Sequence, residues 1–139
     1  RYTSYPTVPY WEDNINQDIW INSIKSNFKK EEGISLYIHL PFCESLCTYC
    51  GCNKRITKNH AVEQPYIETL LQEWKMYLAL FPEKPTLKEI HLGGGTPTFF
   101  SAENLNYLIS NILNSVFLVP EAELSVEVHP NYTTSEQLK

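Results

Sequence analysis

Three short segments of alternating apolar and polar residues, separated by two long amphipathic segments, limit the fold more than any other feature of the chain. Residues 34–42, 87–95 and 122–130 are predicted to be strands, because a period of two is typical of a strand with one buried face. Residues 64–81 and 101–117 carry apolar side chains at helical spacing. Strands that alternate with helices predict right-handed βαβ units and a parallel sheet, which is the α/β class.

The N-terminal segment differs from this pattern. Residues 1–17 contain two prolines and several aromatic side chains, and we expect an extended arm because proline disfavours helix at the residue before it. Residues 18–30 are predicted to be a helix that Gly33 ends. We therefore expect an aromatic arm and helix over residues 1–33, followed by the strand–helix units over residues 34–139.

The C-terminal segment carries a helix-start signal. Thr134 and Gln137 have the spacing of a capping box, which predicts the start of a further helix. The sequence stops at Lys139, inside that predicted helix. We therefore expect the chain to be a piece of a longer protein.

Length and charge narrow the classes of function. The 139 residues, 42% of them hydrophobic, suffice for one globular core. The net charge of −5 argues against nucleic acid or an anionic membrane surface as a partner. No apolar run approaches the length of a membrane span, and the first residues lack the pattern of a secretory signal. We expect a cytoplasmic protein with small molecules or proteins as partners.

The predicted strands each have one aliphatic and one polar face, whereas parallel sheets covered on both sides are usually aliphatic throughout. The polar faces carry Tyr37, His39, His91, Gly93, Ser125, Glu127 and His129. Such faces suit the lining of a cavity, so we expect a barrel-like arc with helices outside only. The alternative is that the histidines are hydrogen-bonded core or edge residues without a ligand.

All four cysteines lie within residues 43–52, directly after the first predicted strand, with the spacing C-x3-C-x2-C-x-C. Thiolates bind both zinc and iron–sulfur clusters, and two disulfides are disfavoured in a reducing compartment. Structural zinc usually takes two separated cysteine pairs, which this chain lacks. Cys43, Cys47 and Cys50 lie on a loop short enough to surround one cluster, which leaves Cys52 as a separate thiol. A four-iron cluster held by three cysteines keeps one iron open to another ligand.

The stretch LYIHLPFCESLCTYCGCNK, residues 36–54, resembles the signature loop of the radical S-adenosylmethionine enzymes. More narrowly, the chain resembles the family of oxygen-independent coproporphyrinogen III dehydrogenases. RYTSYPT at residues 1–7, HLGGGTPT at 91–98 and SVEVHP at 125–130 carry this narrower resemblance. It implies that the chain forms the first part of an incomplete radical S-adenosylmethionine (β/α) barrel.

The resemblance also implies a site. Cys43, Cys47 and Cys50 would hold a [4Fe–4S] cluster, and S-adenosylmethionine would complete the coordination of the fourth iron. A first S-adenosylmethionine would meet Tyr37, Gly94 and Glu127, and a second would meet Tyr49, Gly95 and Thr96. The glycines allow close backbone approach to a ligand, although a plain turn is the alternative. His129 stands where the family usually has an acidic residue, which weakens any ligand role for that position.

The implied activity is radical oxidative decarboxylation of two coproporphyrinogen III propionates to vinyl groups, giving protoporphyrinogen IX in anaerobic haem synthesis with an electron donor as partner. The chain alone, as part of a barrel, is expected to lack turnover. Its open barrel edge is expected to favour self-association. The aromatic arm either covers the cavity, with Arg1 meeting a propionate, or packs as a surface tail. Cys52 is either an active-site thiol or a passive one.

Two other functions remain open. The first is a haem-trafficking relative that has the same cysteine loop but binds haem without porphyrinogen chemistry. Such relatives generally have an aromatic residue where this chain has Cys52, and they lack the arm at residues 1–7. The second is a zinc-binding interaction domain. The identity of the bound metal would distinguish this function from that of an iron–sulfur enzyme.

Overall fold

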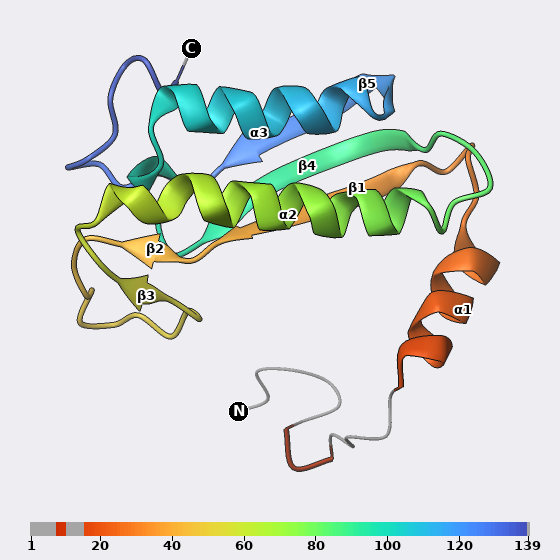
Figure 1. Ribbon diagram of the computed structural model, residues 1–139, viewed down its shortest axis with the longest axis horizontal. Helices are drawn as coiled ribbons and strands as arrows, with labels where there is room; N and C mark the ends of the chain where they lie inside the picture. The colour runs from red at the N-terminus through yellow and green to blue at the C-terminus, as the bar shows by residue number, and fades with distance from the viewer. Residues whose placement is uncertain (1–7, 11–15, 139) are drawn as a thin grey trace.

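The computed structural model describes residues 8–10 and 16–138. Most of the predicted aromatic arm, including Arg1, lies outside the described residues. The main part of the molecule is one sheet with two long helices against one of its faces (Figure 1). Within residues 8–10 and 16–138, no helix has both the length and the apolar character that crossing a membrane requires.

The sheet contains three parallel strands, β1 (Ile34–Leu40), β4 (Thr86–Gly94) and β5 (Phe117–Val126), in the order β1-β4-β5. The predicted parallel α/β fold is thus confirmed. The third strand begins earlier than the sequence indicated and ends at Val126. Glu127 and His129 therefore follow the strand instead of lying in it, which corrects their predicted place.

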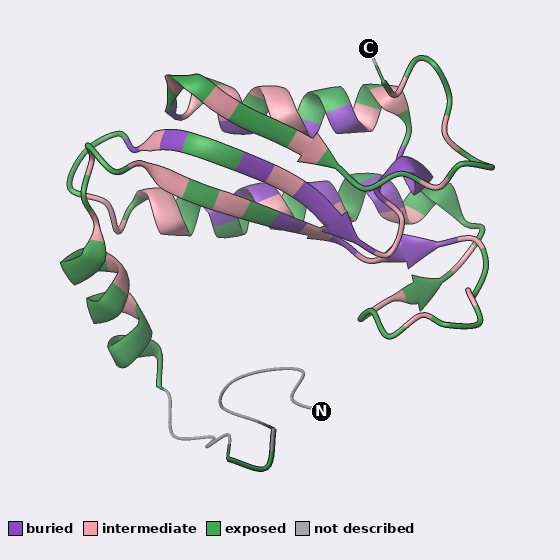
Figure 2. Cartoon of the chain, turned by 180° about the vertical axis from the view of Figure 1, so that it is seen from behind, coloured by how far each residue is buried: buried purple, intermediate pink, exposed green. Residues whose placement is uncertain are grey.

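Helices α2 (Glu63–Leu78) and α3 (Ala102–Asn114) pack on the same face of the sheet, and the opposite face is seen uncovered from behind (Figure 2). Ser101 caps α3, because its side chain accepts a hydrogen bond from the Asn104 backbone N–H. The buried core between sheet and helices includes Ile38, Leu40, Ile67, Leu71, Trp74, Leu87, Ile90, Leu92, Leu105, Leu108 and Ile112. Both helices match the apolar stripes predicted from the sequence.

Helix α1 (Gln17–Asn27) lies beside the end of the sheet where β1 begins (Figure 1). Asn16 caps it by accepting a hydrogen bond from the Ile19 N–H at 2.9 Å. None of its residues is buried. The residue after it packs on the rest of the molecule, since the Phe28 ring lies 4.8 Å from the Phe81 ring, centroid to centroid.

The remaining elements are short. Strands β2 (Phe42–Cys43) and β3 (Arg55–Ile56) form a parallel pair at the base of the cysteine loop, which the sequence did not predict. Single 3-10 turns are η1 (Val8–Tyr10), η2 (His60–Val62) and η3 (Pro97–Phe99). The short pair places Cys43 inside a strand.

The predicted capping box at the C-terminal end is present as a set of hydrogen bonds. The Thr134 N–H donates to Gln137 Oε1 at 2.8 Å, and the Gln137 N–H donates to Thr134 Oγ1 at 3.4 Å. Residues 135–138 form a turn, however, so the predicted helix does not start within the described residues. The Gln137 amide instead donates to the carbonyls of Thr98 and Phe100, which ties this segment to the loop after β4.

Candidate cofactor-binding site

Three loops meet at the carboxyl ends of the parallel strands, where ligand sites of α/β folds are found. The cysteine loop follows β1, a glycine turn ends β4, and residues 127–129 follow β5. Together they line a hollow of about 280 Å³. Of the predicted site residues, the hollow contains Cys43, Cys47, Cys50, Cys52, Tyr49, Gly94, Gly95, Thr96 and Glu127. Tyr37 is outside this set and lies on the polar face of β1.

The cysteine loop is closed at its base by the β2–β3 pair. The Arg55 N–H donates to the Pro41 carbonyl at 2.8 Å, and the Thr57 N–H donates to the Cys43 carbonyl at 2.9 Å. Cys43 is buried, and the Thr96 hydroxyl donates to its Sγ at 3.3 Å. This thiol is thus fixed against the glycine turn, whereas the loop beyond it faces solvent.

Cys50 and Cys52 affect each other's pKa within the loop. The backbone N–H of Cys52 is the main cause that lowers the pKa of Cys50, and Lys54 adds a favourable positive charge. The side-chain hydrogen bond to Cys50 raises the pKa of Cys52, and the negative charge of Cys50 acts in the same direction. Cys50 therefore has the stronger thiolate character of the two, as a metal ligand needs.

The cysteine loop offers donors of the right type for an iron–sulfur cluster, and they surround an open hollow beside a glycine turn. Over residues 8–10 and 16–138, no three His, Cys, Asp or Glu side chains meet in an arrangement that would hold a metal ion. The assignment of Cys43, Cys47 and Cys50 as ligands therefore stays a prediction.

The glycine turn has a packing requirement of its own. Gly94 has φ of 118°, which favours glycine, and its N–H donates to Glu127 Oε2 at 3.1 Å. A Cβ on Gly95 would lie 2.6 Å from the backbone of Pro41. A Cβ on Gly94 would lie 2.7 Å from the His39 ring. The close approach that these glycines allow is thus an approach to the end of β1.

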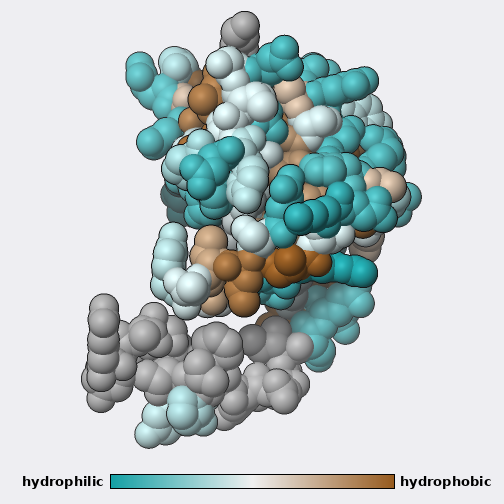
Figure 3. All heavy atoms as spheres, turned by 90° about the vertical axis from the view of Figure 1, so that its left-hand side faces the viewer, coloured by the Kyte–Doolittle hydropathy of each residue, from teal (hydrophilic) through white to brown (hydrophobic). Residues whose placement is uncertain are grey.

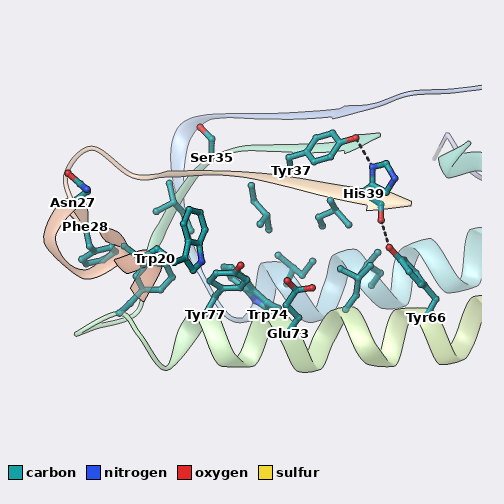
Figure 4. A pocket seen from close by; sticks show the side chains of 18 residues that line it. Trp20, Asn27, Phe28, Ser35, Tyr37, His39, Tyr66, Glu73, Trp74 and Tyr77 are labelled. Atoms are coloured by element: carbon teal, nitrogen blue, oxygen red, sulfur yellow. Dashed lines mark hydrogen bonds between the residues drawn. The ribbon is translucent and has the colours of Figure 1, made fainter. Parts of the chain in front are cut away.

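The polar face of the sheet is a connected set of side chains. Tyr37 stacks on His91 with ring centroids 5.7 Å apart. The Tyr37 hydroxyl lies 3.2 Å from His39 Nδ1 (Figure 4). His39 Nε2 lies 2.7 Å from the Asn53 carbonyl oxygen, which links the face to the cysteine loop. Burial is the main cause that raises the pKa of Tyr37, and the negative charge of Glu127 adds to it. The histidines therefore have hydrogen-bond partners on a face that still opens to solvent.

The His129 side chain stabilises the turn that follows it. Its Nδ1 accepts a hydrogen bond from the Asn131 N–H at 3.3 Å, and its ring packs 4.7 Å from that of Tyr132. A side-chain acceptor for the N–H two residues later is what Asp or Asn supplies in such turns. The imidazole therefore supplies an acceptor that an acidic side chain would also supply at this position.

Sequence reasoning missed Glu63, which is only 2% exposed. Its carboxylate accepts hydrogen bonds from the Ser101 N–H at 2.9 Å and the Asn104 amide at 2.7 Å, and it lies 2.7 Å from His60 Nδ1. The His60 ring in turn stacks on Phe99, with centroids 4.4 Å apart. Glu63 thus fixes the start of α3, and the only sequence signal for it was its place beside a helix start.

A larger apolar groove of about 600 Å³ was also missed. It lies between α1, β1 and α2, and its aromatic lining includes Trp20, Phe28, Trp74 and Tyr77 (Figure 4). It is separate from the cysteine-lined hollow.

The end of the molecule at the left of Figure 1 is largely hydrophilic, with a band of hydrophobic residues (Figure 3).

Comparison with known proteins gives a consistent result, although no family model matches the chain. It is 33% identical over 132 residues to the oxygen-independent coproporphyrinogen III oxidase of Pseudomonas aeruginosa, covering 94% of this chain and 29% of that protein. It is 36% identical over 134 residues to the oxidase of the same name from Paracoccus denitrificans, again covering 94% and 29%. The chain thus spans about 30% of the length of the curated relatives that it matches.

A solved structure shows the same fold. Coproporphyrinogen III oxidase from Escherichia coli, described as a radical SAM enzyme, superposes with a TM-score of 0.84 and 32% sequence identity. The match covers 96% of this chain and 30% of that one. With its parallel sheet and its cysteine loop at the carboxyl strand ends, the chain thus has the fold of part of a radical SAM enzyme. More narrowly, it is homologous to part of the oxygen-independent coproporphyrinogen III oxidases.

Proposed function

We propose that this chain forms the part of an oxygen-independent coproporphyrinogen III oxidase that holds a [4Fe–4S] cluster and S-adenosylmethionine. One observation carries the proposal: the cysteine loop, the glycine turn and Glu127 line a single hollow at the carboxyl ends of the strands. The names of the relatives support the same activity and the substrate coproporphyrinogen III. The activity belongs to a protein about three times longer than this chain.

Cys43, Cys47 and Cys50 are the proposed cluster ligands. When bound, the cluster and S-adenosylmethionine supply the radical chemistry that removes hydrogen from a substrate propionate. The Thr96 hydroxyl donates to Cys43 Sγ, and such a hydrogen bond orients a ligand sulfur and lowers its charge density. The chain's own contribution is thus to hold the thiols and to tune one of them.

The proposed S-adenosylmethionine contacts divide by chemistry. The Glu127 carboxylate, fixed by the Gly94 N–H, offers a negative partner for a ligand ammonium group. Tyr37 contributes a half-exposed ring and hydroxyl next to this carboxylate. A second S-adenosylmethionine would use Tyr49, Gly95 and Thr96, and the Tyr49 ring is 90% exposed and free to stack. We propose two such ligands per full-length protein.

In the complete protein, each of two propionates would lose one hydrogen atom to the radical, and then carbon dioxide and one electron, to become a vinyl group. That oxidation needs an electron donor to start each radical step and an acceptor to receive the substrate's electrons. We propose a cytoplasmic protein, and we propose that this chain alone does not turn over because its sheet is only the first part of a barrel.

Anaerobic reconstitution with iron and sulfide tests the cofactor assignment. We expect a four-iron electron paramagnetic resonance signal after reduction, and we expect S-adenosylmethionine to change it. Cys43→Ala should abolish the signal, whereas the matched variant Cys52→Ala should keep it. A signal that survives Cys43→Ala, or tight zinc in place of iron, would show that the assignment is wrong.

The haem-trafficking alternative is tested on the full-length protein. Coproporphyrinogen decarboxylation without stable haem binding is the expected result, and haem binding without decarboxylation would favour the alternative. Cys52 lies in the hollow beside the proposed ligands, which supports the oxidase.

The outer edge of β5 is the proposed site of self-association for the isolated chain. Leu124 and Val126 are 52% and 39% exposed on this strand, and within the described part of the chain β5 pairs with β4 alone. Unpaired strand edges with apolar side chains promote contacts between copies. Sedimentation velocity should show concentration-dependent dimers that Leu124→Lys weakens. A monomer at every concentration would contradict this proposal.

A further inference from the structure

The Glu127 carboxylate must be held in place by residues outside its own strand, because it follows the end of β5 and is exposed. Oε2 accepts the Gly94 N–H at 3.1 Å. Oε1 lies 3.4 Å from His91 Nε2. The carboxylate therefore has a backbone partner on one oxygen and an imidazole on the other.

The other nitrogen of His91 determines what Nε2 can offer. His91 Nδ1 lies 2.7 Å from Ser125 Oγ, on the neighbouring strand. A neutral imidazole carries its proton on one nitrogen only. If Nδ1 carried it, the lone pair of Nε2 would face the Glu127 carboxylate, which is repulsive. If Nε2 carries it, the Ser125 hydroxyl donates to Nδ1 and the imidazole N–H points at the carboxylate. Only the second arrangement makes both contacts attractive.

The ring of His91 is also held in its plane. Tyr37 stacks on it with an interplanar angle of 17°. Gly93 makes room for the carboxylate, because a Cβ there would lie 3.1 Å from Glu127 Oε1 and 2.9 Å from the Tyr37 ring. The side chains of His91, Tyr37 and Glu127 thus pack against one another above Gly93.

We propose that His91 is a positioning residue that presents the Glu127 carboxylate to the ligand, with Ser125 selecting the tautomer that carries the proton on Nε2. The inference deepens the proposed function and rests on it for the identity of the ligand. It assigns His91 no contact with the ligand itself.

Two substitutions of His91 separate positioning from simple packing. The amide of His91→Gln reaches toward the place of Nε2 and keeps a donor for Glu127, whereas that of His91→Asn reaches only toward the place of Nδ1. We expect His91→Asn to weaken S-adenosylmethionine binding to the reconstituted chain about tenfold, as loss of a hydrogen bond to a charged group does. His91→Gln should restore most of it. Equal affinities of the two variants would overturn the proposal.

The tautomer is measured without any cofactor. Long-range proton–nitrogen NMR correlations of the His91 ring at mildly alkaline pH should show a protonated Nε2 and an acceptor Nδ1. Ser125→Ala should reduce the preference for this tautomer, whereas Ser110→Ala on α3 should not. A protonated Nδ1 in the wild-type chain would overturn the proposal. If the wild-type chain forms no cluster and binds no S-adenosylmethionine, the proposed function fails while the tautomer measurement still decides this inference.

Discussion

The two faces of the sheet use the same strands for different purposes. On one face, Ile38 and Leu40 of β1 are buried in the core together with residues of α2 and α3. On the other face, His39 of the same strand is hydrogen-bonded to the cysteine loop, and Tyr37 stacks on His91 of β4. Burial of apolar area stabilises the fold, while the polar face contributes little apolar burial and is free to carry chemistry. A substitution at a buried position of β1 is therefore expected to affect stability, whereas a substitution at the next position along the strand is expected to affect function.

The largest expected effect is on the buried face. Leu108→Ala removes a fully buried side chain and should lower the free energy of unfolding by about 2–5 kcal/mol, because it leaves a cavity. Urea unfolding followed by circular dichroism measures it. The control Met76→Ala, at a side chain that is 66% exposed, should change the value by less than about 0.5 kcal/mol. If Ser125→Ala on the polar face costs as much as Leu108→Ala, the division between the faces does not hold.

Glu63 is the polar exception on the helix side. Glu63→Gln replaces an acceptor with an amide that faces the donors of Ser101 and Asn104, and should cost about 1–3 kcal/mol of stability. The matched variant Glu68→Gln changes an exposed carboxylate whose partners are also exposed, and should be close to neutral. Chemical denaturation of both variants gives the comparison. A neutral Glu63→Gln would mean that the buried carboxylate does not hold α3.

The glycine turn lies between the two faces. Gly95→Ala should cost about 1–3 kcal/mol, because its Cβ would meet the Pro41 backbone at 2.6 Å and one loop must shift. Gly51→Ala is the control, since a Cβ there meets nothing within 4 Å. Thermal unfolding compares the two variants. An unchanged melting temperature for Gly95→Ala would show that the two loops approach less closely than described.

The smallest expected effect concerns a hydrogen bond between α2 and β1. The Tyr66 hydroxyl of α2 donates to the His39 carbonyl at 2.7 Å, so Tyr66→Phe should cost about 0.5–1.5 kcal/mol. Burial chiefly raises the pKa of Tyr66, and Glu73 adds to it. A raised pKa means that the folded chain holds the phenol proton more tightly than the unfolded chain does. This contribution is therefore present below the ordinary tyrosine pKa of about 10 and is lost as the pH rises through the higher folded value. Unfolding at neutral and at strongly alkaline pH should show that loss in the wild-type chain and a smaller one in Tyr66→Phe.

The sequence predicted the strands and helices well where alternation was regular, as in β1 and α3. It placed the start of β5 too late, because residues 117–121 (FLVPE) do not show the strict alternation of residues 122–128. The structure accommodates Pro120 in an irregular part of the strand, where the register with β4 shifts between Leu87 and Glu89. A proline cannot donate a hydrogen bond in a regular strand ladder, but it is tolerated where the pairing is irregular. No local sequence pattern indicates that β5 is irregular at this point.

The candidate site was predictable only in part. The loop motifs indicated which residues would gather, and the structure brings Cys43, Thr96 and Glu127 to one hollow. The β2–β3 pair could not be predicted, because two-residue strands carry no period. The partners of Glu63 lie far along the chain, at Ser101 and Asn104, and such contacts depend on how α2 and α3 pack.

The hydrogen bonds at the base of the cysteine loop bear on how fast and how completely a cofactor can load. With Pro41 tied to Arg55 and Cys43 tied to Thr57, residues 44–54 form a closed ring whose ends are already joined before any metal arrives. The entropy of bringing the ends together is therefore lost during folding and not during metal binding. Incoming iron and sulfide need to order only the inside of the ring.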